Sequence, residues 1–336
     1  MLDLATLNKF DSQGMFKIYD KWSEIAKESY EKKTKTANFE DIDNIIFVGM
    51  GGSGTIGDVF SAILSRKKIH ISIVKGYSLP KTIDAKTLVV FTSITGNTSE
   101  TLYVLDLARK LGTKTISFSN GGMMKEFCNK NNLEYRNIDA FHSPRASFTS
   151  FLYSMISILD SIFPITKIEV RESLTQLDEL CKQISSSNLT ETNPALSLAH
   201  WISSMPLIYH PWGLQAAAIR FKNSLQENAK IHAMTENVIE TCHNGIVAWE
   251  KPSNVKPILL QGIDDHVKTK ERWRILKEYF HANNIECREV ISVKGNILSK
   301  LINLIYLLDF STIYLAALSK IDPSPIESID FIKKRL

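Results

Sequence analysis

The stretch NIIFVGMGGSGTIGDVFSAIL, residues 44–64, joins a mostly apolar run to a glycine-rich turn and then to a helix-like segment. An apolar run that stops at such a turn is typical of a strand buried inside a parallel sheet. Gly49, Gly51 and Gly54 have the spacing G-x-G-x-x-G of a dinucleotide-binding loop. The stretch therefore predicts an α/β unit and makes NAD the first candidate ligand.

An NAD site needs a further residue, an acid at the end of the second strand that accepts a hydrogen bond from the ribose. The second strand-like run is residues 70–74, and Lys75, Gly76 and Tyr77 follow it. Because no Asp or Glu stands at that position, the sequence disfavours a dinucleotide and leaves the glycine turn open to another ligand.

Strand-like and helix-like segments alternate in two parts of the chain, which indicates parallel sheets covered by helices on both faces. In the first part the predicted strands are 44–48, 70–74, 87–92, 114–118 and 133–136, and the predicted helices are 56–64, 98–111 and 123–129. In the second part the predicted strands are 206–210, 257–261 and 287–291, and the predicted helices are 212–226 and 267–282. We therefore predict an α/β fold of two subdomains, each a parallel sheet flanked by helices.

The same pattern predicts the domain organisation. An N-terminal helical segment covers 1–37, with one helix predicted at 7–33, a first subdomain covers 38–145, and a second covers 146–336. The second subdomain opens with a helical connection, at 146–163 and 168–185, and a polar loop at 186–194 follows it. It ends in a C-terminal tail.

Composition excludes several classes of protein. The chain has 336 residues, 44% of them hydrophobic, and a net charge of +4 with acids and bases well mixed. A nucleic-acid binder would show a basic stripe or a known module, so we expect no nucleic-acid partner. The four cysteines form no C-x-x-C pair, and no His/Glu cluster has metal-ligand spacing. We therefore expect neither a metal nor another cofactor.

Residues 297–318 are apolar enough to be tested as a membrane span. The segment contains Lys300, Asn303 and Asp309, and a charge at the centre of a span costs roughly 2.5–3.5 kcal/mol on insertion scales. We interpret the segment as a buried core helix. The N-terminus lacks a positive region followed by an apolar stretch, so we predict a soluble, cytoplasmic protein without a membrane partner.

A second turn, SITGNTSET at residues 93–101, follows the strand predicted at 87–92 and precedes a helix. Asn97 and Glu100 have the spacing of a capping pair. Hydroxyl groups and unpaired N–H groups at a helix N-terminus bind anions without needing a lysine. A phosphate could accept hydrogen bonds from Ser93, Thr95 and Thr98 together. An ordinary capped turn is the alternative.

The pattern S-x-T-G-N-T-x-E-T resembles the phosphate loop of the sugar isomerase (SIS) fold. The glycine turn at 49–54 resembles the first loop of that fold, which lies alongside the sugar. The resemblance implies a sugar-phosphate site in which Gly51, Gly52 and Ser53 contact the substrate together with the hydroxyls of residues 93–98.

The second subdomain contains two candidate acid–base groups. Glu227 is predicted at the C-terminal end of an amphipathic helix, where the helix dipole opposes a carboxylate and makes it more basic, which suits a general base. A surface Glu beside Lys230 is the alternative. His243 lies between a helix-like segment and an apolar, strand-like segment. A lone histidine is more often structural than catalytic.

Four motifs together resemble the bifunctional phosphoglucose/phosphomannose isomerases, a branch of the SIS proteins. They are E-N-A-K from Glu227, E-x-x-H-N-x-I-V-x-W-E from Glu240, P-R-A around Arg145, and the tail D-P-x-P from Asp322 through to the final leucine. Their order, from about residue 45 to the C-terminus, is more specific than any one of them.

This resemblance implies a function and a role for each residue. The protein would interconvert glucose 6-phosphate and mannose 6-phosphate with fructose 6-phosphate through an enediolate, as a homodimer. Glu227 would move the proton between C1 and C2, and His243, reaching in from the partner subunit, would open the ring. Lys333 would assist ring opening, and Arg145 would stabilise the enediolate and exclude water.

Departures from the family pattern leave alternatives open. Thr95 replaces a frequent Ser, Gly245 replaces a frequent acid after His-Asn, and Lys334 beside Lys333 competes for the lysine role. Another SIS isomerase, acting on an amino-sugar or heptose phosphate, is one alternative function. A non-catalytic sugar-phosphate sensor is the other.

Overall fold

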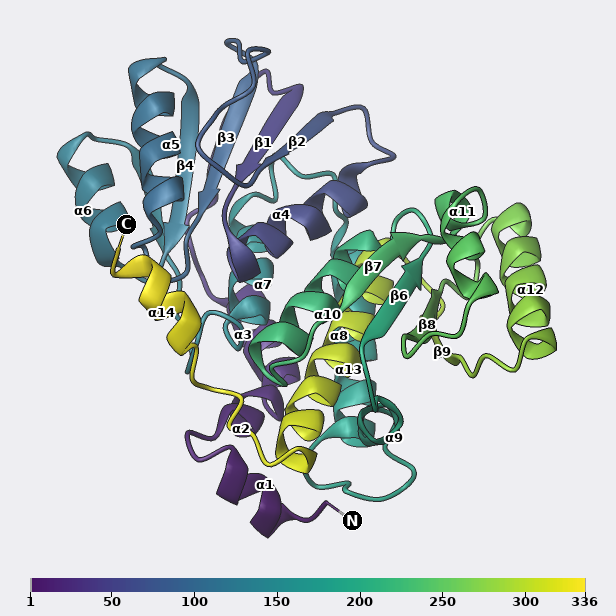
Figure 1. Cartoon of the computed structure of the whole chain (residues 1–336). Helices are drawn as coiled ribbons and strands as arrows, with labels where there is room; N and C mark the ends of the chain where they lie inside the picture. Colours follow the sequence, from purple (N-terminus) through teal and green to yellow (C-terminus); the bar gives the residue numbers. More distant parts are fainter. Residues whose placement is uncertain (1, 336) are drawn as a thin grey trace. The chain divides into compact units, whose positions relative to one another are not determined.

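The computed structural model describes residues 2–335, and these residues form two compact units (Figure 1). The five-strand unit runs from Lys21 to Leu174, and the four-strand unit contains the chain up to Asp20 and from Thr175 onward. These boundaries differ from the predicted ones at 37/38 and 145/146. The reason is packing: helix α3 (Trp22–Glu31) packs against α7 (Phe148–Ile158) in the five-strand unit, with Trp22 stacked on Phe148 and bonded to the carbonyl of Ala146.

The five-strand sheet is parallel throughout and has the strand order β2-β1-β3-β4-β5. Its strands are β1 (Asn44–Val48), β2 (His70–Val74), β3 (Thr87–Thr92), β4 (Lys114–Ser119) and β5 (Glu134–Asn137). Every residue of β1 and β3 is buried, as expected of strands covered on both faces. The strands predicted at 44–48, 70–74 and 87–92 are confirmed.

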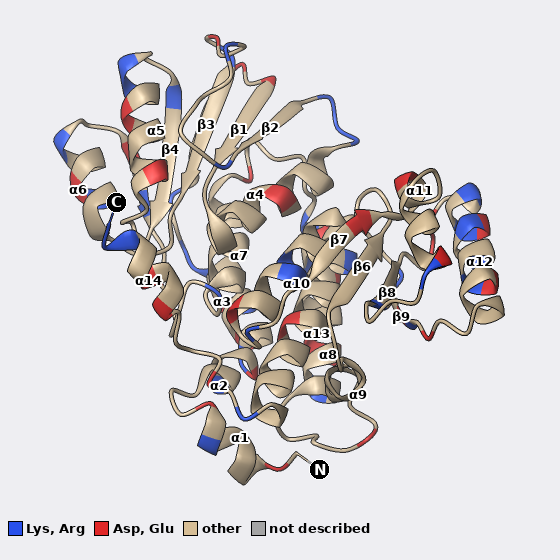
Figure 2. Cartoon of the chain, viewed as in Figure 1, with Lys and Arg blue, Asp and Glu red and all other residues tan. Residues whose placement is uncertain are grey.

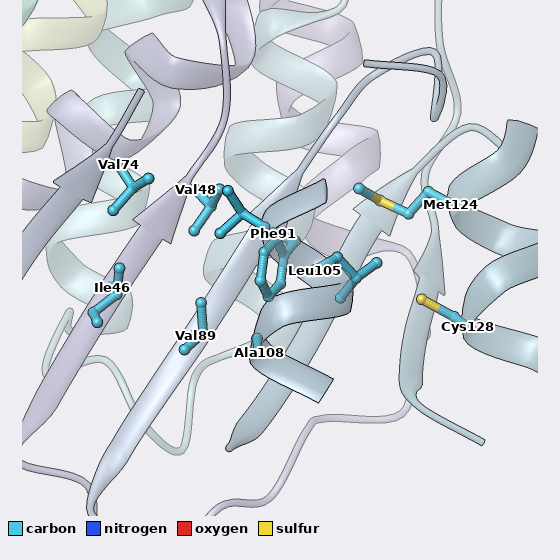
Figure 3. Close-up of a cluster of buried hydrophobic side chains, with 10 residues drawn as sticks. Ile46, Val48, Val74, Val89, Phe91, Leu105, Ala108, Met124 and Cys128 are labelled. Carbon is cyan, nitrogen blue, oxygen red and sulfur yellow. The ribbon is translucent and has the colours of Figure 1, made fainter. Parts of the chain in front are cut away.

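Helices cover both faces of this sheet. They are α3, α4 (Gly51–Leu64), α5 (Ser99–Lys110), α6 (Gly122–Lys130) and α7, and α8 (Lys167–Ile184) begins in this unit. On one face Val48, Val89 and Phe91 pack against Leu105 and other residues of α5 and α6 (Figure 3). On the other face Phe47 stacks on Phe60 of α4, with 5.2 Å between ring centroids.

The strand order fixes where this unit can bind a ligand. The chain moves from β1 to β2 on one side and returns to β3 on the other, so the order reverses between β1 and β3. In open parallel sheets, ligands bind at this switch point, outside the carboxyl ends of the strands. The loops that leave β1 and β3 there are the glycine turn and the hydroxyl-rich turn.

The four-strand sheet is also parallel, with the order β7-β6-β8-β9. Its strands are β6 (Pro206–His210), β7 (Met234–Asn237), β8 (Lys256–Gln261) and β9 (Arg288–Ile291). The helices are α1 (Leu4–Phe10), α2 (Met15–Tyr19), the rest of α8, α9 (Pro194–Trp201), α10 (Gln215–Glu227), α11 (Val238–Thr241), η1 (Gly245–Glu250), α12 (Val267–Ala282), α13 (Ile297–Leu318) and α14 (Glu327–Lys333). Figure 2 shows both signs of charge interspersed on α12.

Helix α13 is the core of this unit. Within residues 2–335 it is the one helix long and apolar enough to span a membrane, and 89% of its most apolar window is buried inside the protein. Its charged residue Asp309 is fully buried and accepts hydrogen bonds from Arg220 and Ser224 of α10 and from Tyr19. The predicted core helix at 297–318 is confirmed.

Three local predictions were wrong. The single N-terminal helix at 7–33 is three helices, because Asp11 accepts from the N–H groups of Met15 and Phe16 and starts a new turn. Helix α4 begins at Gly51, five residues before the predicted start. Residues 245–250 form a 3₁₀ helix rather than a strand, because Trp249 turns inward and donates to the Tyr209 hydroxyl at 2.8 Å.

Candidate functional site

The hydroxyl-rich turn after β3 is held by its own side chains. Ser93 Oγ lies 2.9 Å from Thr98 Oγ1, so the first and last hydroxyls of the turn are bonded to each other. Ser93 is fully buried, Thr98 is half-buried and Thr95 is exposed. Gly96 has φ +73°, and a Cβ there would lie 1.9 Å from the carbonyl oxygen of Gly121. Only glycine fits at this point of the turn.

The turn ends at the N-terminus of α5. The N-cap residue is Thr98, whose side chain makes no capping bond. The expected cap at Asn97 was therefore wrong by one residue: its Oδ1 accepts from the N–H of Met123 at 3.0 Å instead. The first N–H groups of a helix have no partner within it, and the helix dipole makes this end positive. Exposed hydroxyls beside such N–H groups suit an anion.

The glycine turn after β1 lies against the hydroxyl-rich turn. Ser53 is nearly buried, and its Oγ accepts from the N–H of Ile94 at 3.3 Å, which joins the two turns. Gly51 has φ +53° and open space on its Cβ side, with nothing within 4 Å, whereas a Cβ at Gly54 would lie 2.8 Å from the carbonyl of Gly49. Gly51 and Gly52 thus begin α4 at the open side of the turn, and Gly54 allows the helix to pack closely.

Arg145 belongs to the same unit. It follows Pro144 and precedes α7, and only 4% of it is exposed. Ser147 Oγ fixes this segment by donating to the carbonyl of Ser143 at 2.8 Å. A buried guanidinium is always charged, so the segment holds a permanent positive charge inside the protein.

Glu227 is the last residue of α10, as predicted, and is half-buried. Arg220 and Ser224 precede it by seven and three residues on the helix, and both bond to Asp309. Burial, the largest single influence, lowers the pKa of Arg220, but the charge and hydrogen bonds of Asp309 together with Tyr19 and Glu227 outweigh it and raise that pKa above its ordinary value. This buried pair fixes the last two turns of α10.

His243 lies in the exposed loop between α11 and η1. The loop is anchored on both sides: Thr241 Oγ1 donates to Glu236 Oε2 at 2.8 Å, and Asn244 Nδ2 donates to Glu240 Oε1 at 2.9 Å. The imidazole is presented at the surface of this unit.

Lys333 is the last residue of α14, and Lys334 is the C-cap; both are exposed. The predicted tail motif also includes Leu336, which lies outside the described residues.

The structure brings the predicted residues together only in part. In the five-strand unit Ser53, Ser93 and Thr98 belong to two linked turns at the switch point. In the four-strand unit Glu227 lies near the tail, because Lys230 bonds to both. Sequence reasoning missed the roles of Glu236 and Asp309, whose partners are identified only by the fold. Among the described residues, no group of three His, Cys, Asp or Glu side chains could hold a metal ion.

Two parallel sheets with a hydroxyl-rich phosphate-type loop define this chain as a protein of the sugar isomerase (SIS) class. Residues 38–158 match the SIS domain, and residues 191–336 match the bacterial phospho-glucose isomerase C-terminal SIS domain. The C-terminal domain of glucosamine-fructose-6-phosphate aminotransferase from Francisella tularensis has the same fold, with a TM-score of 0.70 over 91% of this chain and 96% of that chain at 13% identity.

Curated relatives make the assignment narrower. A bifunctional phosphoglucose/phosphomannose isomerase from Caldicellulosiruptor bescii is 32% identical over 88% of this chain and 90% of its own length. The chain belongs to the bifunctional phosphoglucose/phosphomannose isomerase family. A relative from Sulfolobus acidocaldarius, a D-glucosamine-6-phosphate 4-epimerase, is 26% identical over 69% of this chain and 72% of its own length.

Proposed function

We propose that this protein interconverts glucose 6-phosphate and mannose 6-phosphate with fructose 6-phosphate. The observation that carries this proposal is the 32% identity, over 88% of the chain, to a relative named for both isomerisations. The paired hydroxyls of Ser93 and Thr98, at a helix N-terminus, support a phosphomonoester as the group that is bound.

The proposed phosphate contacts are Ser53, Ser93, Thr95, Thr98 and the first N–H groups of α5, with Gly51 and Gly52 beside the sugar. Each hydrogen bond to a charged group contributes about 1.5–3 kcal/mol, so several of them anchor the substrate away from its reacting carbons. Thr98 and Thr95 are accessible, and a phosphate oxygen can replace the mutual bond of Ser93 and Thr98 by accepting from both.

The proposed chemistry is proton transfer on the open-chain sugar. The Glu227 carboxylate removes the proton from C2, and the C–H electron pair forms the C1=C2 bond of an enediolate whose charge lies on O1. Glu227 then delivers to C1 either that proton or a solvent proton that has exchanged with it, O1 is protonated, and loss of the O2 proton leaves the C2 ketone. A positioned base of this kind contributes about 10²–10⁴-fold. Arg145 would stabilise the enediolate, because a fixed cation near a developing oxyanion lowers the barrier.

Ring opening is assigned to His243 and Lys333. The exposure of His243 supports a role in the site of a partner subunit, so we propose a homodimer. We also propose that the enzyme is cytoplasmic. This chemistry needs no metal, because the charge that develops is met by protein groups.

One assay tests the proposal. The purified protein, with EDTA, is supplied separately with glucose 6-phosphate and mannose 6-phosphate, and fructose 6-phosphate is measured. We expect product from both sugars and none with the Glu227→Gln protein. The family relation to a D-glucosamine-6-phosphate epimerase makes an amino-sugar phosphate the second candidate substrate. Turnover of glucosamine 6-phosphate alone would replace the proposal, and binding without any turnover would indicate a sensor.

A further inference from the structure

Lys230 bridges two segments of the four-strand unit that are far apart in the sequence. Its Nζ donates to the carbonyl oxygen of Glu227 at 2.5 Å and to the carbonyl oxygen of Pro325 at 2.6 Å. Glu227 ends α10, and Pro325 lies in the tail two residues before α14 begins. One ammonium group therefore joins the helix end that carries the proposed base to the tail that carries Lys333.

The backbone at this position does not require a lysine. Lys230 has φ +58°, in the left-handed region that glycine enters without steric cost and most other residues avoid. The turn would form more easily with glycine. What a glycine would lack is the lysine side chain. Its positive charge lies at the C-terminus of α10, where the helix dipole is negative, and it also binds the tail.

Helix α14 has little packing of its own to fix its position. It has seven residues and none of them is buried, and so short a helix is marginal without tertiary contacts. Farther up the tail, Pro323 is buried and Asp322 accepts from Ser12 Oγ at 3.0 Å. The Lys230 bond to Pro325 lies nearest the start of α14.

We propose that Lys230 is a positioning residue for the isomerase reaction. By tying Pro325 to the end of α10, it fixes where α14 and Lys333 lie relative to Glu227. The inference rests on the proposed function, because it assigns Lys230 a role in placing two groups of that reaction. Lys230 need not touch the substrate.

The chain contains a matched control in Lys320. It also has a left-handed backbone, with φ +59°, directly after the C-cap of a long helix, and it is exposed. Glycine suits both positions, so Lys230→Gly and Lys320→Gly should each keep or raise the melting temperature. Lys230→Asn, whose side chain also tolerates this backbone, is a second variant in case the glycine protein folds poorly.

The measurements are kcat, KM and the rate of chymotrypsin cleavage after Phe331 on α14. We expect Lys230→Gly to lower kcat about tenfold or more, to change KM less than about threefold, and to speed the cleavage severalfold. Lys320→Gly should leave all three within about twofold of the parent. Lys230→Arg should recover a large part of kcat, because its guanidinium can also donate to two carbonyl groups.

Two results would overturn the inference: a folded Lys230→Gly protein with the parent kcat, or one whose kcat falls while cleavage of α14 stays unchanged. Failure of the proposed function is a separate outcome. If the parent protein isomerises neither sugar phosphate, the proposed reaction is wrong, and the cleavage rates of the two glycine variants still decide whether Lys230 holds the tail.

Discussion

Ser93 and Thr98, at opposite ends of one turn, share a hydroxyl–hydroxyl hydrogen bond of 2.9 Å. Because each hydroxyl is held by the other, replacing either one should disturb the same phosphate contact. We expect Ser93→Ala and Thr98→Ala each to raise KM about 10- to 100-fold with a smaller effect on kcat, since phosphate contacts act in ground and transition states alike. Steady-state kinetics with glucose 6-phosphate measures both constants.

A double variant tests whether the two hydroxyls act on the same phosphate contact. Coupled groups give non-additive effects, so Ser93→Ala/Thr98→Ala should raise KM by much less than the product of the single effects. Ser65→Ala, at an exposed serine at the far end of α4, is the control and should leave KM unchanged. Unchanged KM in the loop variants would place the phosphate elsewhere.

The buried pair of Arg220 and Asp309 predicts a large effect on stability. Asp309→Asn would leave the Arg220 charge buried without its carboxylate, a change that costs about 3–5 kcal/mol. A loss of that size lowers the melting temperature by roughly 6–20 °C for a unit of this size. Differential scanning calorimetry measures the shift. Replacing both residues, as Arg220→Met/Asp309→Leu, should recover part of it, and a shift below about 2 °C in the single variant would contradict the prediction.

The position of Gly245 indicates which contact fixes the His243 loop. A Cβ at residue 245 would lie 2.6 Å from Glu236 Oε2, the atom that accepts from Thr241. Gly245→Ala should therefore displace that carboxylate, shift the loop and lower kcat several-fold, with little change in melting temperature because the displaced atom ends a flexible side chain. In the Glu236→Ala background the same substitution should have a much smaller effect. Equal effects in both backgrounds would show that the contact is unimportant.

The proposed dimer predicts recovery of activity by mixing two inactive proteins. If His243 acts in the partner's site, a heterodimer of Glu227→Gln and His243→Ala chains has one site with both changes and one with neither. A random mixture is about half heterodimer, so activity should return to about a quarter of the parent level. Mass spectrometry of tagged chains verifies exchange. No recovery after verified exchange would mean that both residues act within one chain.

Much of the fold could be predicted because its signals are local. The fully buried strands at 44–48, 87–92 and 206–210 are apolar runs bounded by turn residues, and α13 begins and ends as predicted. The start of α4 could not be predicted, because glycine is a poor helix former and the first residues of α4 are rich in it. Gly54 is required there by packing, since a Cβ would lie 2.8 Å from the carbonyl oxygen of Gly49.

Some features of the candidate site could likewise be predicted from the sequence, and others could not. The hydroxyl-rich turn and the helix-terminal position of Glu227 are local patterns that a sequence reveals. Contacts such as Lys230 with Pro325 or Arg220 with Asp309 join residues 95 and 89 positions apart, and no periodicity signals them. Such contacts become visible only once the four-strand unit is folded.

The measurement that tests the central claim most directly is isotope incorporation in D₂O. Glucose 6-phosphate is incubated with the parent protein and with Glu227→Gln, and NMR follows C1 of fructose 6-phosphate and C2 of the aldose phosphates. An enediolate formed by a carboxylate base exchanges part of its proton with solvent, so the parent should introduce deuterium at both carbons. Glu227→Gln should lose both turnover and exchange by about 10²-fold or more. Turnover or exchange that survives in Glu227→Gln would contradict the assignment of Glu227 as the base.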